Sequence, residues 1–299
     1  MPHVKANGLD IYCESHGDDA AEPILLIMGL GAQMTRWSPD FIAALVAAGH
    51  RVVVFDNRDV GLSEKLDAAG APDMKAVAAA LMGGTAPRVA YTLQDMAADA
   101  AGVLDALGIE RAHIVGASMG GMIAQLVAAD HPGKTLSLTS VMSSTGNPNL
   151  PRATPEAMAR LNTPAPDPNT DLEGYLASAV TGAKVMSQKY PPDEAAVRAG
   201  SLADFKRCYY PVGFQRQYAG IMASPDRRPK LKTIAAPTVV IHGDADPLVP
   251  LAGGRDTAEN IPGAELIIVE GVGHEMPAAV QDQFVAGILS AVARARVAA

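Results

Sequence analysis

Short apolar segments alternate with longer helical patterns along most of this chain, and this alternation limits the possible fold more than any other feature. The apolar segments are rich in β-branched residues and are bounded by Gly, Pro or Asp, which is typical of buried strands. They lie at residues 24–28, 52–55, 113–115, 136–141, 238–241 and 265–269. Because these segments are apolar almost throughout, we expect both faces of each strand to be covered.

Helical patterns separate the apolar segments, for example at residues 39–48, 93–107 and 120–130. Strands that alternate with helices of this length form a parallel sheet with crossover helices. The sequence therefore predicts an α/β fold. Near the start of the chain, Asn7-Gly8 separates residues 4–6 from residues 9–13, which predicts a β-hairpin at one edge of the sheet.

The alternation stops after Ser144. From 146 to 229 the chain contains many prolines, no segment typical of a buried strand, and helical patterns at 171–188 and 202–222. We therefore expect a core formed by residues 1–145 and 230–299, with a helical cap, or lid, inserted at 146–229.

Aromatic residues are concentrated in this insertion, which holds five of the seven tyrosines and two of the five phenylalanines. These rings either pack the insertion onto the sheet or line an apolar pocket under the lid. The candidate substrate contacts among them include Phe205, Tyr209 and Phe214.

The composition excludes several classes of partner. A net charge of −8 gives neither a nucleic acid nor an acidic membrane surface an electrostatic reason to approach. No apolar run reaches the roughly 18 to 20 residues of a membrane-spanning helix, and residues 1–10 lack the pattern of a signal peptide. We therefore expect a cytoplasmic protein that acts on a small molecule, and the sequence leaves a homodimer open.

The two cysteines give no sign of a disulfide or a metal site. Cys13 and Cys208 stand far apart and lack the spacing of metal ligands. We expect two reduced thiols in packed positions, and no metal.

The chemistry of the chain is indicated first by Gly116-Ala-Ser-Met-Gly120, which lies between a predicted strand and a predicted helix. A serine in such a tight turn has a strained backbone and an exposed hydroxyl, and the residues two before and two after it must be small. The helix that follows directs N–H groups and its positive end at the attacked carbonyl. The position after a strand, rather than the motif alone, makes Ser118 a candidate nucleophile.

A serine nucleophile requires a histidine base that is oriented by a carboxylate, and on this architecture the chain order is Ser, acid, His. Asp244 and Asp246 follow the strand predicted at 238–241, and His274 is the one histidine beyond them. We expect Ser118, Asp246 and His274 to form a catalytic triad, with Asp244 as the rival acid.

From Ile24 onward the chain resembles the α/β-hydrolase superfamily, and within it the aclacinomycin methylesterase-like and general carboxylesterase-like group. The resemblance rests on the serine motif, on Gly243–Pro250 as the acid loop, and on Gly-x-Gly-His at 271–274. It implies an α/β-hydrolase fold, with a mostly parallel sheet and helices on both faces.

The resemblance also assigns the oxyanion hole, the pair of backbone N–H groups that stabilise the developing negative charge, to Leu30 and Met119. The oxyanion loop Met28-Gly-Leu-Gly31 departs from the family pattern, because Met28 replaces the usual histidine. Asp56-Asn-Arg-Asp59-x-Gly-x-Ser63 resembles a family loop whose arginine, here Arg58, is generally structural.

The expected activity is hydrolysis of small to medium carboxylic esters through an acyl-enzyme, which requires no cofactor or metal. A serine at the nucleophile position excludes the haloalkane dehalogenases and epoxide hydrolases of the superfamily, which need a carboxylate there. Two alternatives use the same triad: a cofactor-free perhydrolase or haloperoxidase, and a C–C or enol-lactone hydrolase. A small-molecule receptor with a hydrolase pocket is an alternative of another class, because function depends on the pocket rather than the fold.

Overall fold

The computed structural model describes residues 3–298, and within them eight strands form one sheet in the order β1-β2-β4-β3-β5-β6-β7-β8. The strands are β1 (His3–Ala6), β2 (Leu9–His16), β3 (Pro23–Ile27), β4 (Arg51–Phe55), β5 (Ala112–Ala117), β6 (Thr135–Val141), β7 (Thr238–Gly243) and β8 (Glu265–Val269). Every pair from β4 to β8 is parallel, whereas β2 runs antiparallel to both its neighbours. The predicted α/β fold with a mostly parallel sheet is confirmed.

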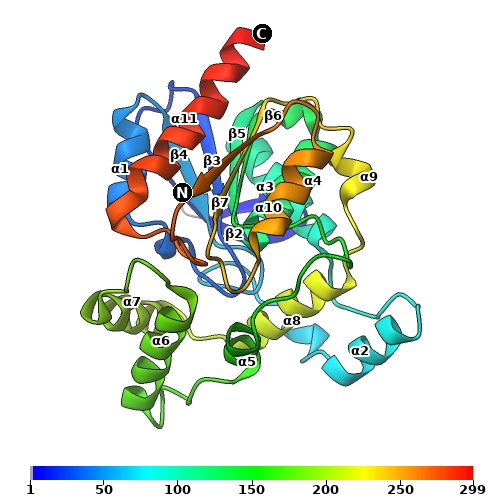
Figure 1. Cartoon of the computed structure of the whole chain (residues 1–299), viewed down its shortest axis with the longest axis vertical. Coiled ribbons are helices and arrows are strands. Elements are labelled where there is room, and N and C mark those ends of the chain that lie inside the picture. Colours follow the sequence, from blue (N-terminus) through cyan, green and yellow to red (C-terminus); the bar gives the residue numbers. More distant parts are fainter. Residues whose placement is uncertain (1–2, 299) are drawn as a thin grey trace.

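Helices connect the strands and cover both faces of the sheet (Figure 1). The α-helices are α1 (Pro39–Ala47), α2 (Met74–Met82), α3 (Leu93–Ala106), α4 (Met119–Asp130), α5 (Pro155–Asn162), α6 (Leu172–Met186), α7 (Glu194–Arg207), α8 (Pro211–Ala223), α9 (Arg228–Leu231), α10 (Leu251–Asn260) and α11 (Gln281–Ala298). Short 3-10 helices are η1 (Met34–Arg36), η2 (Asp67–Ala69), η3 (Pro132–Lys134) and η4 (Ala278–Val280). Among the helices within the described residues, none is both long enough and apolar enough to cross a bilayer.

Two apolar cores lie on opposite faces of the sheet. On one face, α3 and α4 contribute buried residues such as Met96 and Ile123. On the other face, α1 and α11 contribute residues such as Leu45 and Phe284. Alternate side chains of the inner strands enter each core, for example Leu25 and Leu26 of β3, so these strands are apolar along their whole length.

The predicted hairpin is present at the edge of the sheet, where β1 pairs with β2. Asn7 and Gly8 both have positive φ, 49° and 82°, as a two-residue type I′ turn requires. The expected placement beside the parallel strands is also confirmed, because β2 pairs with β4.

Two expectations about individual elements were wrong. Strand β8 is not covered on both faces: it lies at the edge of the sheet, and Ile268 is 41% exposed. The helix expected at 202–222 is two helices, α7 and α8, which are separated at Cys208–Tyr210. Pro211 explains the break, because its ring disfavours helical geometry at Tyr210, whose φ and ψ are −144° and 75°.

Residues 146–229, which lie between β6 and β7, contain helices α5 to α8, the start of α9 and no strand. Helices α5 to α8 gather at one end of the sheet (Figure 1). At this end, the carbonyl of Met186 in the last turn of α6 accepts a hydrogen bond from the backbone N–H of His274, in the loop after β8. Because the strands from β5 to β8 are parallel, β5 and β7 finish at the same end.

Strand β3 lies between β4 and β5 in the sheet. The chain passes from β3 to β4 on one side and then crosses to β5 on the other side, so the strand order reverses here. In open α/β sheets the carboxyl ends of the strands at such a switch point form the usual ligand-binding crevice. The oxyanion loop follows β3 and Ser118 follows β5, which places both at this point.

Candidate active site

The turn at Ser118 has the strained backbone that the sequence predicts. Ser118 has φ 56° and ψ −119°, a conformation that costs free energy for any residue with a side chain. A Cβ added to Gly116 would lie 2.0 Å from the carbonyl oxygen of Gly120, and one added to Gly120 would lie 2.0 Å from that of Ile27. Glycine at both positions therefore lets β5 turn directly into α4 and leaves Ser118 partly exposed.

The structure brings Ser118, Asp246 and His274 together although they come from three separate loops. His274 Nε2 lies 2.9 Å from Ser118 Oγ, and His274 Nδ1 lies 2.7 Å from Asp246 Oδ2. The Asp246 side chain is fully buried, whereas the His274 side chain is 10% exposed. This geometry allows proton transfer from the hydroxyl to the ring while the carboxylate holds the ring in place.

The acid loop fixes Asp246 through its other oxygen. Asp246 Oδ1 accepts hydrogen bonds from the backbone N–H groups of Leu248 at 2.9 Å and Val249 at 2.8 Å. Asp244 has a different role, since its Oδ1 accepts a hydrogen bond from the Gly271 N–H at 2.6 Å. It thereby holds the backbone of the histidine loop, residues 271–275, which carries His274. Of the two candidate acids, Asp246 is therefore the one in contact with the His274 ring.

A second histidine, His242, lies beneath Asp246. Its Nε2 is 2.7 Å from the Val249 carbonyl oxygen and 3.6 Å from Asp246 Oδ2. Burial lowers the pKa of His242, and the nearby carbonyl and carboxylate only partly oppose this effect. His242 is therefore neutral around pH 7 and leaves Asp246 free to pair with His274.

The histidine loop is held against the insertion. A Cβ on Gly273 would lie 1.9 Å from the Met186 carbonyl oxygen, so only glycine permits this approach. On the other side of His274, Glu275 accepts a hydrogen bond from the Ser187 hydroxyl. Burial raises the pKa of Glu275, although the hydrogen bonds to its carboxylate oppose the shift. The last turn of α6 thus helps to position His274.

The two backbone amides expected to form the oxyanion hole have no acceptor of their own. Within residues 3–298, neither the Leu30 N–H nor the Met119 N–H donates a hydrogen bond to another protein group. Gly29 lies directly beside the nucleophile, since a Cβ added there would be 3.8 Å from Ser118 Oγ. The oxyanion loop and the start of α4 therefore leave two amides available next to Ser118.

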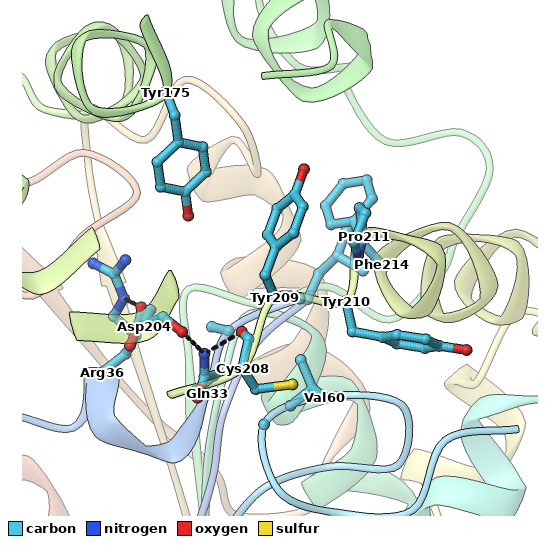
Figure 2. A pocket seen from close by; sticks show the side chains of 14 residues that line it. Gln33, Arg36, Val60, Tyr175, Asp204, Cys208, Tyr209, Tyr210, Pro211 and Phe214 are labelled. Carbon is cyan, nitrogen blue, oxygen red and sulfur yellow. Dashed lines mark hydrogen bonds and ion pairs between the residues drawn. The ribbon is translucent and has the colours of Figure 1, made fainter. Parts of the chain in front are cut away.

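A cavity of about 450 Å³ lies between the oxyanion loop and the insertion (Figure 2). Tyr209 and Phe214 line it, as the sequence suggests, but Phe205 does not. Phe205 packs behind the wall, with ring centroids 5.9 Å from Tyr209 and 6.2 Å from Tyr175. Its place on α7 points the ring at its aromatic neighbours rather than at the cavity.

Sequence reasoning missed the polar part of this cavity. The walls include Gln33, Arg36 and Asp204, and Arg36 Nε lies 2.6 Å from Asp204 Oδ2 (Figure 2). Gln33 donates from Nε2 to the carbonyl oxygens of Asp204 and Cys208. No signal in the sequence links these residues, because about 170 positions separate the two sides of the cavity.

The loop from Asp56 to Ser63 joins the core to the insertion. Arg58 is buried and bonds both oxygens of Asp99 at 2.6 Å, a structural role of the kind that the resemblance implies. Asp59 has a positive φ of 67°. It forms a buried ion pair with Arg216 of α8, with contacts of 2.7 and 2.8 Å.

Among residues 3–298, no group of three or more His, Cys, Asp or Glu side chains is arranged to hold a metal ion. Cys13 and Cys208 are both free thiols.

The sequence matches a known protein family over most of its length. Residues 22–277 match the family model described as the alpha/beta hydrolase fold. Rhodomycin D methylesterase DnrP of Streptomyces peucetius is 29% identical to this chain, and the alignment covers 93% of each chain. A putative carbamate hydrolase, RutD of Variovorax paradoxus, is also 29% identical, and the alignment covers 89% of this chain and 90% of the relative.

Among solved structures, the enol-lactonase of Burkholderia xenovorans LB400 is similar in fold, with a TM-score of 0.71 and 23% identity. The alignment covers 98% of this chain and all of the enol-lactonase chain. The family match extends over most of the chain and includes Ser118, Asp246 and His274. The protein therefore belongs to the α/β-hydrolase fold family.

Proposed function

We propose that this α/β hydrolase is a serine carboxylesterase that cleaves small to medium esters through an acyl-enzyme. The observation that carries the proposal is the continuous chain of contacts from Ser118 Oγ through His274 to Asp246, at 2.9 and 2.7 Å. The similarity to a protein named as a methylesterase supports the choice of an ester as substrate.

In the proposed mechanism, Ser118 Oγ attacks the ester carbonyl while its proton passes to His274 Nε2. The carbonyl oxygen becomes an oxyanion and accepts hydrogen bonds from the Leu30 and Met119 N–H groups. Collapse of this intermediate breaks the bond to the alkoxy group, which leaves as the alcohol after taking the proton from His274. An acyl group then remains bonded to Ser118.

Deacylation repeats these steps with water as the nucleophile. His274 takes a proton from the water, the hydroxide attacks the acyl carbon, and Ser118 Oγ leaves and recovers its proton from His274. The buried Asp246 carboxylate orients the imidazole and stabilises its charged form in both half-reactions.

In this proposal residues 146–229 form a cap over the site, and the cavity that Leu30 helps to line holds one end of the substrate. The rings of Tyr175, Tyr209 and Phe214 favour an uncharged, partly apolar group there. A volume of about 450 Å³ suits a small or medium group better than a long lipid chain or a polymer.

The proposal is tested with Ser118→Ala and an activated ester such as p-nitrophenyl acetate. We expect turnover to fall by about 10⁴-fold or more, because the variant lacks the attacking group. Ser143→Ala is the matched control, since Ser143 is a buried serine next to Gly121 in the first turn of α4 and its hydroxyl has no hydrogen-bond partner among residues 3–298.

A fluorophosphonate probe, followed by peptide mass spectrometry, gives a second measurement. The probe should modify Ser118 in the wild-type protein and leave Ser118→Ala unmodified. Equal turnover by the wild type and Ser118→Ala, or modification of a different serine, would reject the assignment of the nucleophile.

A further inference from the structure

The oxyanion loop is held by a side chain from the insertion. Gly31 follows Leu30, and its backbone N–H donates to Gln217 Oε1 of α8 at 2.8 Å. Gln217 Nε2 donates to the carbonyl oxygen of Arg58, also at 2.8 Å. The Gln217 side chain is fully buried. Because one partner is a donor and the other an acceptor, only this orientation of the amide satisfies both.

A second amide holds the start of the same loop. Asn57 Nδ2 donates to the carbonyl oxygen of Met28 at 2.9 Å, and Asn57 is buried. The loop therefore has a fixed hydrogen bond before Leu30 and another after it. The Leu30 N–H is left between these two anchors without a protein acceptor within residues 3–298.

Helix α8 presses closely on the loop at the position of Gly31. Gly31 has φ 66°, and a Cβ added there would lie 2.6 Å from Cδ2 of Phe214. Phe214 and Gln217 are three residues apart and therefore on the same side of α8. Gly31 is thus covered by the Phe214 ring and hydrogen-bonded to Gln217, both from one helical turn.

Helix α8 is itself fixed against the core. Arg216, next to Gln217, forms the buried ion pair with Asp59. One turn earlier, a Cβ on Gly213 would lie 1.9 Å from the Asp59 carbonyl oxygen, so glycine allows the helix to approach the loop. The position of the Gln217 amide is therefore determined by contacts of the helical turn that leads to it.

We infer that Gln217 is a positioning residue for the oxyanion hole. By holding the Gly31 N–H, it fixes the peptide plane next to the Leu30 amide, so that the Leu30 N–H already points at the developing oxyanion before reaction. This inference rests on the proposed serine-esterase function. In this role, helix α8 of the insertion helps to stabilise the transition state and also lines the cavity.

The test compares Gln217→Met with the wild type on p-nitrophenyl acetate. Methionine is similar in size but cannot accept from Gly31 or donate to Arg58. Loss of one oxyanion donor in other enzymes lowers kcat by about 10²- to 10³-fold, so misplacement of one donor should lower kcat by about 10- to 100-fold. We expect KM to change by less than about threefold, because the oxyanion forms only in the transition state.

A trifluoromethyl ketone provides a readout that a purely structural role would not change. It forms a tetrahedral adduct with Ser118 and places an oxyanion in the same hole. Its affinity for Gln217→Met should fall by about the same factor as kcat, while the pH dependence of kcat should keep its midpoint because His274 and Asp246 are unaffected.

Two further variants complete the experiment. Gln217→Glu keeps an acceptor for the Gly31 N–H and should retain more kcat than Gln217→Met. Gln125→Met is the matched control, because Gln125 is also fully buried and hydrogen-bonded, to Ser140 and Arg227, but does not contact the oxyanion loop. This control should lower the melting temperature and keep kcat within about twofold.

The outcomes separate this inference from the proposed function. If Gln217→Met keeps kcat and inhibitor affinity within twofold while Ser118→Ala is inactive, the positioning role is wrong and the esterase function stands. If Ser118→Ala remains active, the proposed function itself fails. Should Gln217→Met fail to fold, Gln217→Ala, which also removes the acceptor for the Gly31 N–H, decides: a fall in kcat matched by a fall in inhibitor affinity supports the role, and unchanged values reject it.

Discussion

The central strands and the helices of the insertion are held in place by different kinds of contact. All six residues of β5 are buried, so packing on both faces fixes the strand that leads directly to Ser118. In contrast, α5 and α7 each bury one residue and α6 buries two. The position of the nucleophile therefore depends on the core, where many packing contacts together fix the backbone.

Several polar contacts join the insertion to the core. They include the ion pairs Asp59–Arg216, Asp56–Arg207 and Arg36–Asp204, with distances of 2.6 to 2.7 Å. A packed apolar core changes little with pH, whereas ion pairs depend on the protonation of their members. We therefore expect single substitutions and acid pH to alter the insertion and its cavity more easily than the backbone at Ser118.

The largest expected effect tests the core side of this comparison. Asp246→Asn should lower turnover by about 10⁴-fold, because the amide no longer holds His274 in the required tautomer. Asp244→Asn should lower turnover by less than about tenfold, since the Asp244 carboxylate bonds the Gly271 N–H and it is Asp246 that bonds His274. Steady-state kinetics of both variants measure the ratio. The reverse ranking would transfer the role of catalytic acid to Asp244.

The second prediction concerns the buried ion pair that joins the insertion to the core. Asparagine tolerates the positive φ of residue 59, so Asp59→Asn removes the charge with little change in the backbone. It leaves the Arg216 guanidinium buried without its anion, which should cost about 3 to 5 kcal/mol of unfolding free energy. Urea unfolding at pH 7 measures this loss. A loss below about 1 kcal/mol would mean that the Asp59–Arg216 pair does not hold the insertion to the core.

The pH dependence of stability gives an independent check on the same pair. Burial alone would raise the pKa of Asp59, but hydrogen bonds from Arg216 and the Leu66 N–H outweigh it and lower the pKa below its ordinary value. The stabilisation is therefore present above about pH 4, the usual range for an unfolded aspartate, and is lost as the pH falls through the lower folded pKa. Asp59→Asn should show a weaker loss of stability in acid than the wild type. Parallel curves for the two proteins would reject this contribution.

The third prediction concerns the cavity. Tyr209→Ala should change the ratio of kcat/KM between a hexanoyl and an acetyl ester by about tenfold, because the ring lines the cavity. Phe205→Ala is the matched comparison and should change that ratio by less than about threefold, since this ring packs behind Tyr209. A chain-length series of activated esters measures both. If every variant keeps the wild-type ranking, the rings serve only in packing.

The smallest expected effect lies on the outer surface of the insertion. Lys184 of α6 and Glu194 of α7 form an ion pair at 2.6 Å, and each side chain is 56% exposed. Solvent screens such pairs, so Lys184→Ala should change the unfolding free energy by less than about 1 kcal/mol. Urea unfolding tests this, and a loss as large as that of Asp59→Asn would mean that exposed and buried pairs contribute equally here.

The sequence predicted the core better than the insertion for a physical reason. Strands buried on both faces and the serine motif are local patterns, and each residue in them has few acceptable replacements. The break at Pro211 is also a local signal, but the helical pattern on both sides concealed it. The edge position of β8 depends on which strands are neighbours, so composition alone could not show that Ile268 is exposed.

The sequence by itself determined the α/β class, the hairpin at Asn7-Gly8 and the candidate chemistry of Ser118, since these follow from local residue patterns. Only the tertiary structure decided that Asp246 rather than Asp244 contacts His274, that Phe205 lies behind the cavity wall, and that Gln217 holds the oxyanion loop. Each of these depends on distances between segments far apart in the chain. Such distances arise from packing and burial across the whole molecule, which no local pattern records.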